Sequence, residues 1–137
     1  MKITRRHLAA LLPALAQAAG KTPMPSGSFE HESLKAKTNG ENTSRDFFAG
    51  YTHSGFHIDM HETDLAPGMA PHAPHRHEHE ELLMLRTGTL EVTIDGKVTK
   101  VGAGSAVYVA SNLEHGWRNS GKTRAAYFVI ALGRDPK

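Results

Sequence analysis

The chain has 137 residues, of which 39% are apolar, which is enough for one domain with a single modest hydrophobic core. Its 16 Lys and Arg against 14 Asp and Glu leave a formal net charge of +2, too small for a nucleic-acid-binding surface, so no nucleic-acid partner is expected. Because cysteine is absent, disulfides, thiolate ligands and cysteine nucleophiles are excluded, and any bound metal must be held by nitrogen and oxygen atoms.

Residues 1–20 have the pattern of a bacterial export signal. Cations at Lys2, Arg5 and Arg6 precede a weakly apolar run that is too short to span a bilayer. The segment TRRHL resembles the twin-arginine export motif, although the phenylalanine and lysine usual after the arginines are missing. A retained amphipathic helix and an ordinary secretion signal remain alternatives. The expectation is a periplasmic or secreted protein that has no membrane contact after signal cleavage.

The next segment, residues 21–46, is rich in Pro, Gly, Ser, Lys, Asn and Thr and has no sustained hydrophobic period. This composition predicts a linker or a loosely ordered arm. From Phe47 onward, short apolar stretches recur between Gly, Pro, Asn and Asp residues. The sequence therefore predicts a folded domain over residues 47–133 and a C-terminal tail over residues 134–137.

The folded part has the pattern of short antiparallel strands. In the stretch TLEVTID the side chains of Leu90, Val92 and Ile94 share one face, which is the period of a half-buried strand. Asp95-Gly96 suits a tight hairpin turn, after which the chain returns. No helical pattern separates the strands, so the sequence predicts an all-β sandwich or closed barrel.

A dense group of histidines and glutamates, HRHEHEE, begins at His75. On a strand, residues i and i+2 project to the same side, so His75 and His77 can bind one ion together. A turn or bulge can bring the Glu81 carboxylate to the same ion. His115, within SNLEHGW, is the natural candidate for a fourth ligand.

These residues resemble the two sequence motifs of the cupins. The first motif has a glycine, a His-x-His pair, a glutamate and a second glycine, here Gly68, His75, His77, Glu81 and Gly88. The distance from the first glycine to the first histidine is one residue longer than usual.

The second cupin motif is matched by Gly104, His115 and Asn119 at the expected spacing. Ala110 occupies its proline position and Asn112 its second glycine position, where asparagine tolerates a left-handed backbone. The resemblance extends over roughly residues 47–132, nearly the whole folded part.

The resemblance implies a small double-stranded β-helix, a jelly-roll-like barrel, that also forms a homodimer. It implies that His75, His77, Glu81 and His115 surround one divalent transition metal such as Fe, Mn, Ni, Cu or Zn. No other cofactor and no further catalytic residue is assigned. The favoured function is a metal-dependent enzyme acting on a small molecule, with dioxygenase-like oxygen chemistry ahead of isomerisation or hydrolysis. The alternatives are a non-enzymatic protein that binds a metal, sugar or oxyanion, and a purely structural metal site.

Other polar side chains near the motifs have less specific patterns. His79 shares the parity of His77 but is expected to be a surface or supporting residue. His57 and His61 lie on the strand face opposite the apolar Ile58, and both a surface role and a cavity-lining role remain open. If His115 points inward, Arg118 must point outward.

Overall fold

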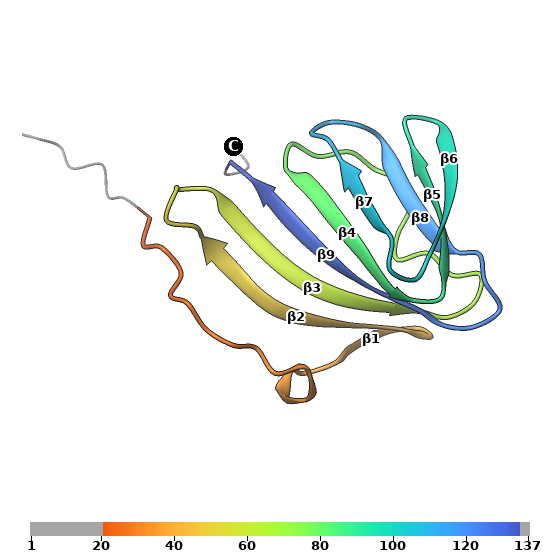
Figure 1. Cartoon of the computed structure of the whole chain (residues 1–137), viewed down its shortest axis with the longest axis horizontal. Helices are drawn as coiled ribbons and strands as arrows, with labels where there is room; N and C mark the ends of the chain where they lie inside the picture. The colour runs from red at the N-terminus through yellow and green to blue at the C-terminus, as the bar shows by residue number, and fades with distance from the viewer. Residues whose placement is uncertain (1–20, 135–137) are drawn as a thin grey trace, which may run out of the picture.

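The computed structural model describes residues 21–134, so the expected export signal and residues 135–137 of the expected tail lie outside the described residues. A 3-10 turn, η1 (His31–Ser33), precedes the strands and is too short to cross a membrane, as is any helix in the described part. The strands, labelled in Figure 1, are β1 (Lys37–Asn39), β2 (Asn42–Tyr51), β3 (His57–Leu65), β4 (Glu80–Thr87), β5 (Thr89–Ile94), β6 (Lys97–Gly102), β7 (Ala106–Val109), β8 (His115–Asn119) and β9 (Ala125–Gly133).

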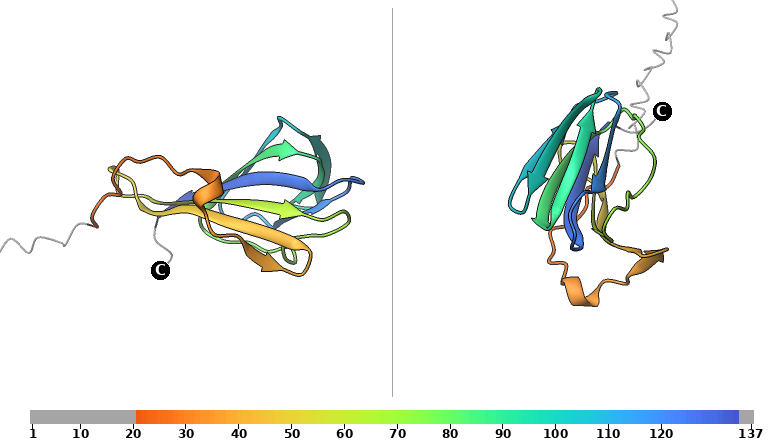
Figure 2. Two further views of the ribbon diagram at one scale, coloured as in Figure 1. Left: turned by 90° about the horizontal axis from the view of Figure 1, so that it is seen from below. Right: turned by 90° about the vertical axis from the view of Figure 1, so that its right-hand side faces the viewer.

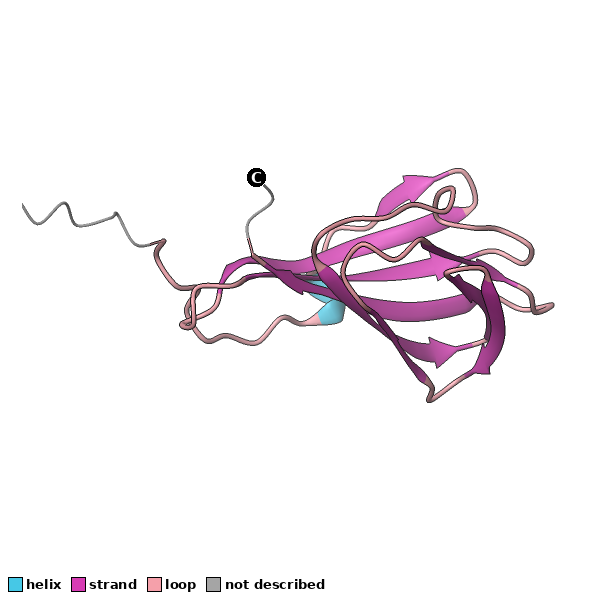
Figure 3. Ribbon diagram, turned by 90° about the horizontal axis from the view of Figure 1, so that it is seen from above, coloured by secondary structure: helices cyan, strands magenta, loops and turns pink. Residues whose placement is uncertain are grey.

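The strands form two antiparallel sheets. The larger sheet has the order β1-β2-β3-β9-β4-β7 and the smaller has the order β6-β5-β8. Two further views show the sheets as separate layers, with η1 outside them (Figure 2), and Figure 3 shows that nearly all regular structure is strand. The predicted all-β class and the double-stranded β-helix architecture are confirmed.

The hydrophobic core lies between the two sheets. The predicted inward residues Leu90 and Val92 on β5 are fully buried, and Ile94 packs against the same core. At the heart of the core, the rings of Trp117 and Tyr127 meet edge to face, and the indole N–H donates a hydrogen bond of 2.7 Å to the phenol oxygen. The remaining buried members are Leu65, Leu83, Leu85, Ala125 and Val129.

Gly88, in the turn between β4 and β5, has a positive φ of 81° and lies against the backbone of β9. An added Cβ atom would lie 2.5 Å from the carbonyl oxygen of Arg124 and 2.6 Å from Cα of Ala125. We expect Gly88→Ala to lower the free energy of unfolding by about 3 kcal/mol, because the left-handed backbone strains an alanine and its Cβ atom would overlap β9. Thermal or urea denaturation measures the effect.

Gly96 provides the matched control for this prediction. It has a φ of 77°, but a Cβ atom there would have no neighbour within 4 Å. Gly96→Ala should therefore show only the backbone strain, about 1–2 kcal/mol. Equal losses in the two variants would mean that the contact with β9 is unimportant.

The N-terminal part of the fold differs from the linker that the composition predicts for residues 21–46. β1 and the first half of β2 lie in this range and extend the large sheet, with Lys37 opposite Ser44 and Ser44 opposite Thr63. The folded part therefore begins before residue 47. These strands lack an apolar alternation because neither of their faces is covered by the small sheet, so their pairing rests on backbone hydrogen bonds.

On the outer face of the large sheet, the carboxylate of Glu62 is buried, with only 2% of the residue exposed. His31 Nε2 lies 2.6 Å from Oε2 of Glu62, and Arg86 Nη2 lies 2.5 Å from Oε1. Arg45 is more distant, at 3.9 Å. We call these four residues the Glu62 cluster. It fastens η1 to the sheet, because its members come from η1, β2, β3 and β4.

Hydrogen bonds with Glu32 and Glu62 raise the pKa of His31 above its usual value. A raised folded-state pKa means that the charged imidazole stabilises the fold fully below the unfolded pKa, and that this stabilisation is lost as pH rises through the folded pKa. The difference in Tm between the native protein and His31→Gln should therefore be larger at about pH 5 than at about pH 8. Thermal melts across this range test the prediction, and His53→Gln, an exposed turn residue, should show no such trend.

Candidate metal centre

Two chain segments that are far apart in sequence meet at the candidate centre. The backbone N–H groups of His75 and His115 each donate to the other residue's carbonyl oxygen, at 3.0 and 2.9 Å. The N–H of Asn112 donates to the carbonyl oxygen of His77 at 2.8 Å. The segment before β4 is thus bound along the start of β8, which places both histidine motifs side by side.

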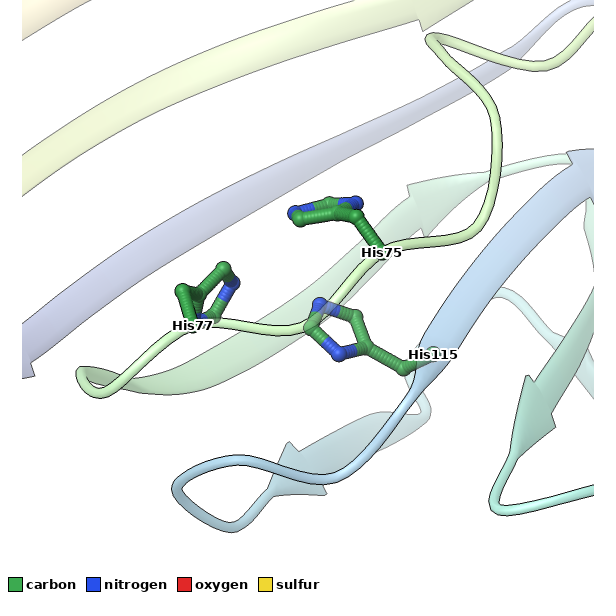
Figure 4. A group of neighbouring side chains, drawn as sticks. All are labelled: His75, His77 and His115. Atoms are coloured by element: carbon green, nitrogen blue, oxygen red, sulfur yellow. The ribbon is translucent and has the colours of Figure 1, made fainter.

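The imidazoles of His75, His77 and His115 converge on one space (Figure 4), and one nitrogen from each ring lies within 4.8 Å of the other two. Their ring centroids are 4.7 to 5.0 Å apart. The predicted histidines are therefore brought together, with His115 fully buried and the other two partly buried.

Glu81, at the start of β4, lies beside two of these imidazoles. Its Oε1 atom is 3.3 Å from Nε2 of His77, and its Oε2 atom is 3.3 Å from Nε2 of His115. A bend at residues 78–79 allows the carboxylate to reach this position on the inner face of the sheet. The carboxylate named from the first motif thus lies against the histidine group, in contact with His77 and His115.

The tautomers of two histidines are fixed by backbone carbonyls. Nδ1 of His77 lies 2.8 Å from the carbonyl oxygen of His79, and Nδ1 of His115 lies 2.9 Å from that of Leu113. Since a carbonyl only accepts, each Nδ1 carries the hydrogen, and Nε2 of the neutral ring presents a lone pair. These lone pairs face the Glu81 carboxylate, which is also an acceptor, and a cation between them would remove the repulsion.

The polar atoms at the centre have no other partners within the described residues. Buried atoms without a hydrogen bond include Nδ1 of His75, Nε2 of His77 and of His115, and Oε2 of Glu81. Buried polar atoms without hydrogen-bond partners are unfavourable. Burial, helped by the neighbouring His72 and His115, also lowers the pKa of His75 and so favours its neutral, ligand-competent form. The donor set therefore fits a divalent transition metal.

His79, which was expected to be a surface or supporting residue, lies directly against this centre. Its ring stacks on that of His77 with centroids 3.5 Å apart, and its Nε2 atom is 3.6 Å from Oε1 of Glu81. His77, His79 and Glu81 form a second group with metal-ligand spacing. Burial and the neighbouring His77 lower the pKa of His79, although 39% of its side chain is exposed. The shared strand parity with His77 was the sequence signal for this position.

A cavity of about 320 Å³ opens beside Glu81. His61 lines this cavity. Of the two roles that the alternation of β3 allowed for this residue, surface or cavity lining, the structure therefore shows cavity lining. His57 lies on the same strand face, because it is four residues away. Residues of β1 and β2 line the opposite side, and sequence reasoning missed them because it expected a linker there.

The second motif folds as expected around β8. Asn112 adopts a φ of 63°, in the left-handed region, where it replaces the usual glycine. Asn119 is fully buried and donates to the carbonyl oxygens of Leu65 and Thr123, so its role is structural. Arg118 points outward, as predicted, and pairs with Glu91 at 2.8 Å.

Two antiparallel sheets that enclose a histidine-rich centre define a class of small β-barrel proteins with a potential metal site. The family model described as Cupin domain matches residues 61–131, slightly more than half of the chain, and this protein belongs to the cupin family.

Solved structures show the same fold. An RmlC-like cupin from Shewanella frigidimarina has a TM-score of 0.65 and 18% identity, covering 79% of this chain and 92% of that chain. A predicted oxalate decarboxylase from Thermotoga maritima has a TM-score of 0.67 and 15% identity, covering 78% and 99%. KdgF from Halomonas sp. has a TM-score of 0.66 and 18% identity, covering 80% and 97%. No curated protein matched the sequence.

Proposed function

We propose that this cupin binds one divalent transition metal through His75, His77, Glu81 and His115 and acts as an enzyme on a small molecule. The observation that carries the proposal is the convergence of four buried nitrogen and oxygen atoms without hydrogen-bond partners. Three nitrogen donors and one carboxylate suit Fe, Mn, Ni, Cu or Zn. The metal would supply Lewis-acid chemistry or, if redox-active, oxygen chemistry.

Dioxygenase-like chemistry is the favoured reaction class because histidines combined with one carboxylate are typical donors for non-haem iron that reacts with oxygen. Glu81 belongs both to the ligand group and to the cavity lining, so its carboxylate lies where a bound substrate would meet the site. In this position it can also exchange a proton with the substrate.

A non-enzymatic binding protein is the second candidate, and it is supported by the cavity, whose lining extends well beyond the histidines and includes several hydroxyl and amide side chains. A binding protein of this kind would retain its ligand after the metal is removed, whereas the enzyme requires the ion.

Elemental analysis of the purified mature protein, followed by oxygen-uptake measurements with a substrate panel, tests the proposal. About one iron or manganese per chain with oxygen consumption is the expected result. Stoichiometric zinc without oxygen consumption would favour hydrolysis, isomerisation or binding. A protein that takes up no transition metal from any supplied salt would overturn the metal proposal.

Export and dimerisation are further parts of the proposal. Replacing Arg5 and Arg6 by lysine and following the protein in periplasmic fractions tests the export route. A homodimer is supported by three large apolar side chains, Leu82, Met84 and Tyr108, which are exposed on the outer face beside the edge strand β7. Light scattering of the mature protein tests the oligomeric state.

A further inference from the structure

The inner face of the large sheet changes from apolar to polar across its strands. One row of paired residues runs from Lys37 through Ser44 and Thr63 to the buried Tyr127. The next row runs from Asp46 through His61 to the buried Val129. The polar ends of both rows lie on β1, β2 and β3, away from the small sheet (Figure 1). We call Lys37, Ser44, Asp46, His61 and Thr63 the polar wall.

The polar wall and the candidate metal centre share one cavity. All five wall residues line it, together with Glu81, Trp117 and Tyr127. β3 and β4 are separated only by β9, so His61 and Glu81 stand on strands about 10 Å apart. A volume of about 320 Å³ lies at the small end of ligand sites, and it suits a molecule of roughly one six-membered ring.

A chain of polar contacts links the core to the wall. The indole N–H of Trp117 donates a hydrogen bond of 2.7 Å to the hydroxyl of Tyr127, and the Thr63 hydroxyl is a second hydrogen-bond partner of that phenol. The phenol oxygen has two lone pairs, so it can accept from both groups. The Thr63 oxygen also has two lone pairs and lines the cavity, so it can accept from a ligand hydroxyl. Burial of Tyr127 raises its pKa and favours the neutral phenol.

The charges on the wall are already balanced. Lys37 forms an ion pair with Asp46, and His61 lies 3.9 Å from a carboxylate oxygen of Asp59. An anionic ligand bound at the wall would therefore find no cation without a carboxylate partner. Ser44 makes no side-chain hydrogen bond among the described residues, so its hydroxyl is available to a ligand. Uncharged hydroxyl or carbonyl oxygens match these groups best.

We propose that the polar wall binds the body of an uncharged, oxygen-rich molecule of about one sugar ring in size, through the hydroxyls of Ser44 and Thr63 and the His61 imidazole. The inference rests on the proposed metal function only for the end of the molecule that reaches Glu81.

Calorimetric titration of zinc-loaded protein with D-xylose, myo-inositol, oxalate and inorganic phosphate tests this assignment, since zinc is redox-inert and prevents oxygen-dependent turnover. At least one of the two neutral probes should bind. Ser44→Ala should weaken its binding by about tenfold, the value of one well-made hydrogen bond. Oxalate, which reaches the metal directly, should be unaffected by this substitution.

Thr63→Val should weaken binding of the neutral probe about as much as Ser44→Ala does. Thr63→Ser should bind the probe like the native protein because it keeps the hydroxyl. Thr99→Val, on β6 outside the cavity, is the matched control and should change nothing. Failure of both neutral probes to bind, or binding that Ser44→Ala leaves unchanged, would overturn the inference.

Zinc content measured in the same samples separates this inference from the metal proposal. Full zinc occupancy without binding of a neutral probe overturns the polar-wall assignment alone. Binding of a neutral probe that depends on Ser44, in protein that takes up neither zinc nor any other supplied transition metal, supports the polar wall and overturns the metal proposal alone.

Discussion

Replacing His115 with alanine is expected to reduce metal affinity by about 100-fold or more and to leave the purified protein essentially metal-free. The side chain is fully buried, its Nδ1 atom is committed to the carbonyl oxygen of Leu113, and its Nε2 atom faces Glu81 without a hydrogen-bond partner. Removal of this donor leaves two histidines and a carboxylate, one fewer than the proposed set. Elemental analysis and calorimetric metal titration measure the loss.

Because His115 is buried, His77→Ala provides a second variant with a smaller structural effect, since 16% of the His77 side chain is exposed. It should lose metal to a similar extent. His53→Ala, in an exposed turn, should retain full occupancy.

His79→Ala is the variant that distinguishes the two possible ligand groups. His79 lies in the group with His77 and Glu81, whereas His115 lies in the group with His75 and His77. If the proposed set is right, His79→Ala should retain most of its metal. Metal loss in His79→Ala with retention in His115→Ala would show that the second group is the binding site.

Metal binding should also stabilise the fold, because the unfolded chain has no preformed site. Adding the metal should therefore raise the Tm of the native protein and have little effect on His115→Ala. An equal rise in both would indicate that the ion stabilises the protein elsewhere.

The histidine centre was predictable because its determinants are local. His75 and His77 have the spacing of neighbours on one strand face, and Asn112 and Asn119 place His115 in a recognisable motif. The burial of Leu90 also followed directly from alternation in one short strand. In each of these cases a few consecutive residues carry the whole signal.

The polar wall could not be predicted in the same way. His61 lies on the inner face of β3 while the apolar Ile58 and Met60 lie on the outer face, which reverses the usual rule that apolar residues face the core. Only the pairing of β3 with β9, whose Val129 is buried opposite His61, decides which face is inward. That pairing is a property of the whole sheet.

The buried carboxylate of Glu62 was missed for a related reason. A glutamate in an alternating strand is normally solvated, and its partners His31, Arg45 and Arg86 come from distant parts of the chain. The composition of the arm that carries His31 predicts a linker. The burial is therefore a consequence of long-range packing that no local pattern indicates.

Replacing Arg86 with methionine is expected to lower the free energy of unfolding by about 3 kcal/mol, because it deprives the buried Glu62 carboxylate of an ion-pair partner at 2.5 Å. His31 and the more distant Arg45 remain and limit the loss. The control Arg118→Met removes the exposed pair with Glu91 and should cost less than about 1 kcal/mol. Urea denaturation of both variants measures the difference.

The double variant Glu62→Met/Arg86→Met shows whether the loss arises from the buried charge or from the packing of the arginine. If the unpaired carboxylate is the cause, removing it as well should recover much of the stability, because an apolar side chain in a buried site needs no counter-ion. Equal stability of Arg86→Met and the double variant would mean that the contact of the Arg86 guanidinium with the Phe128 ring, at 6.0 Å from Cζ to the ring centroid, accounts for the effect. With Glu62→Met as the second single variant, the double-mutant cycle measures how far charge pairing stabilises the outer face of the sheet whose inner face carries the polar wall and Glu81.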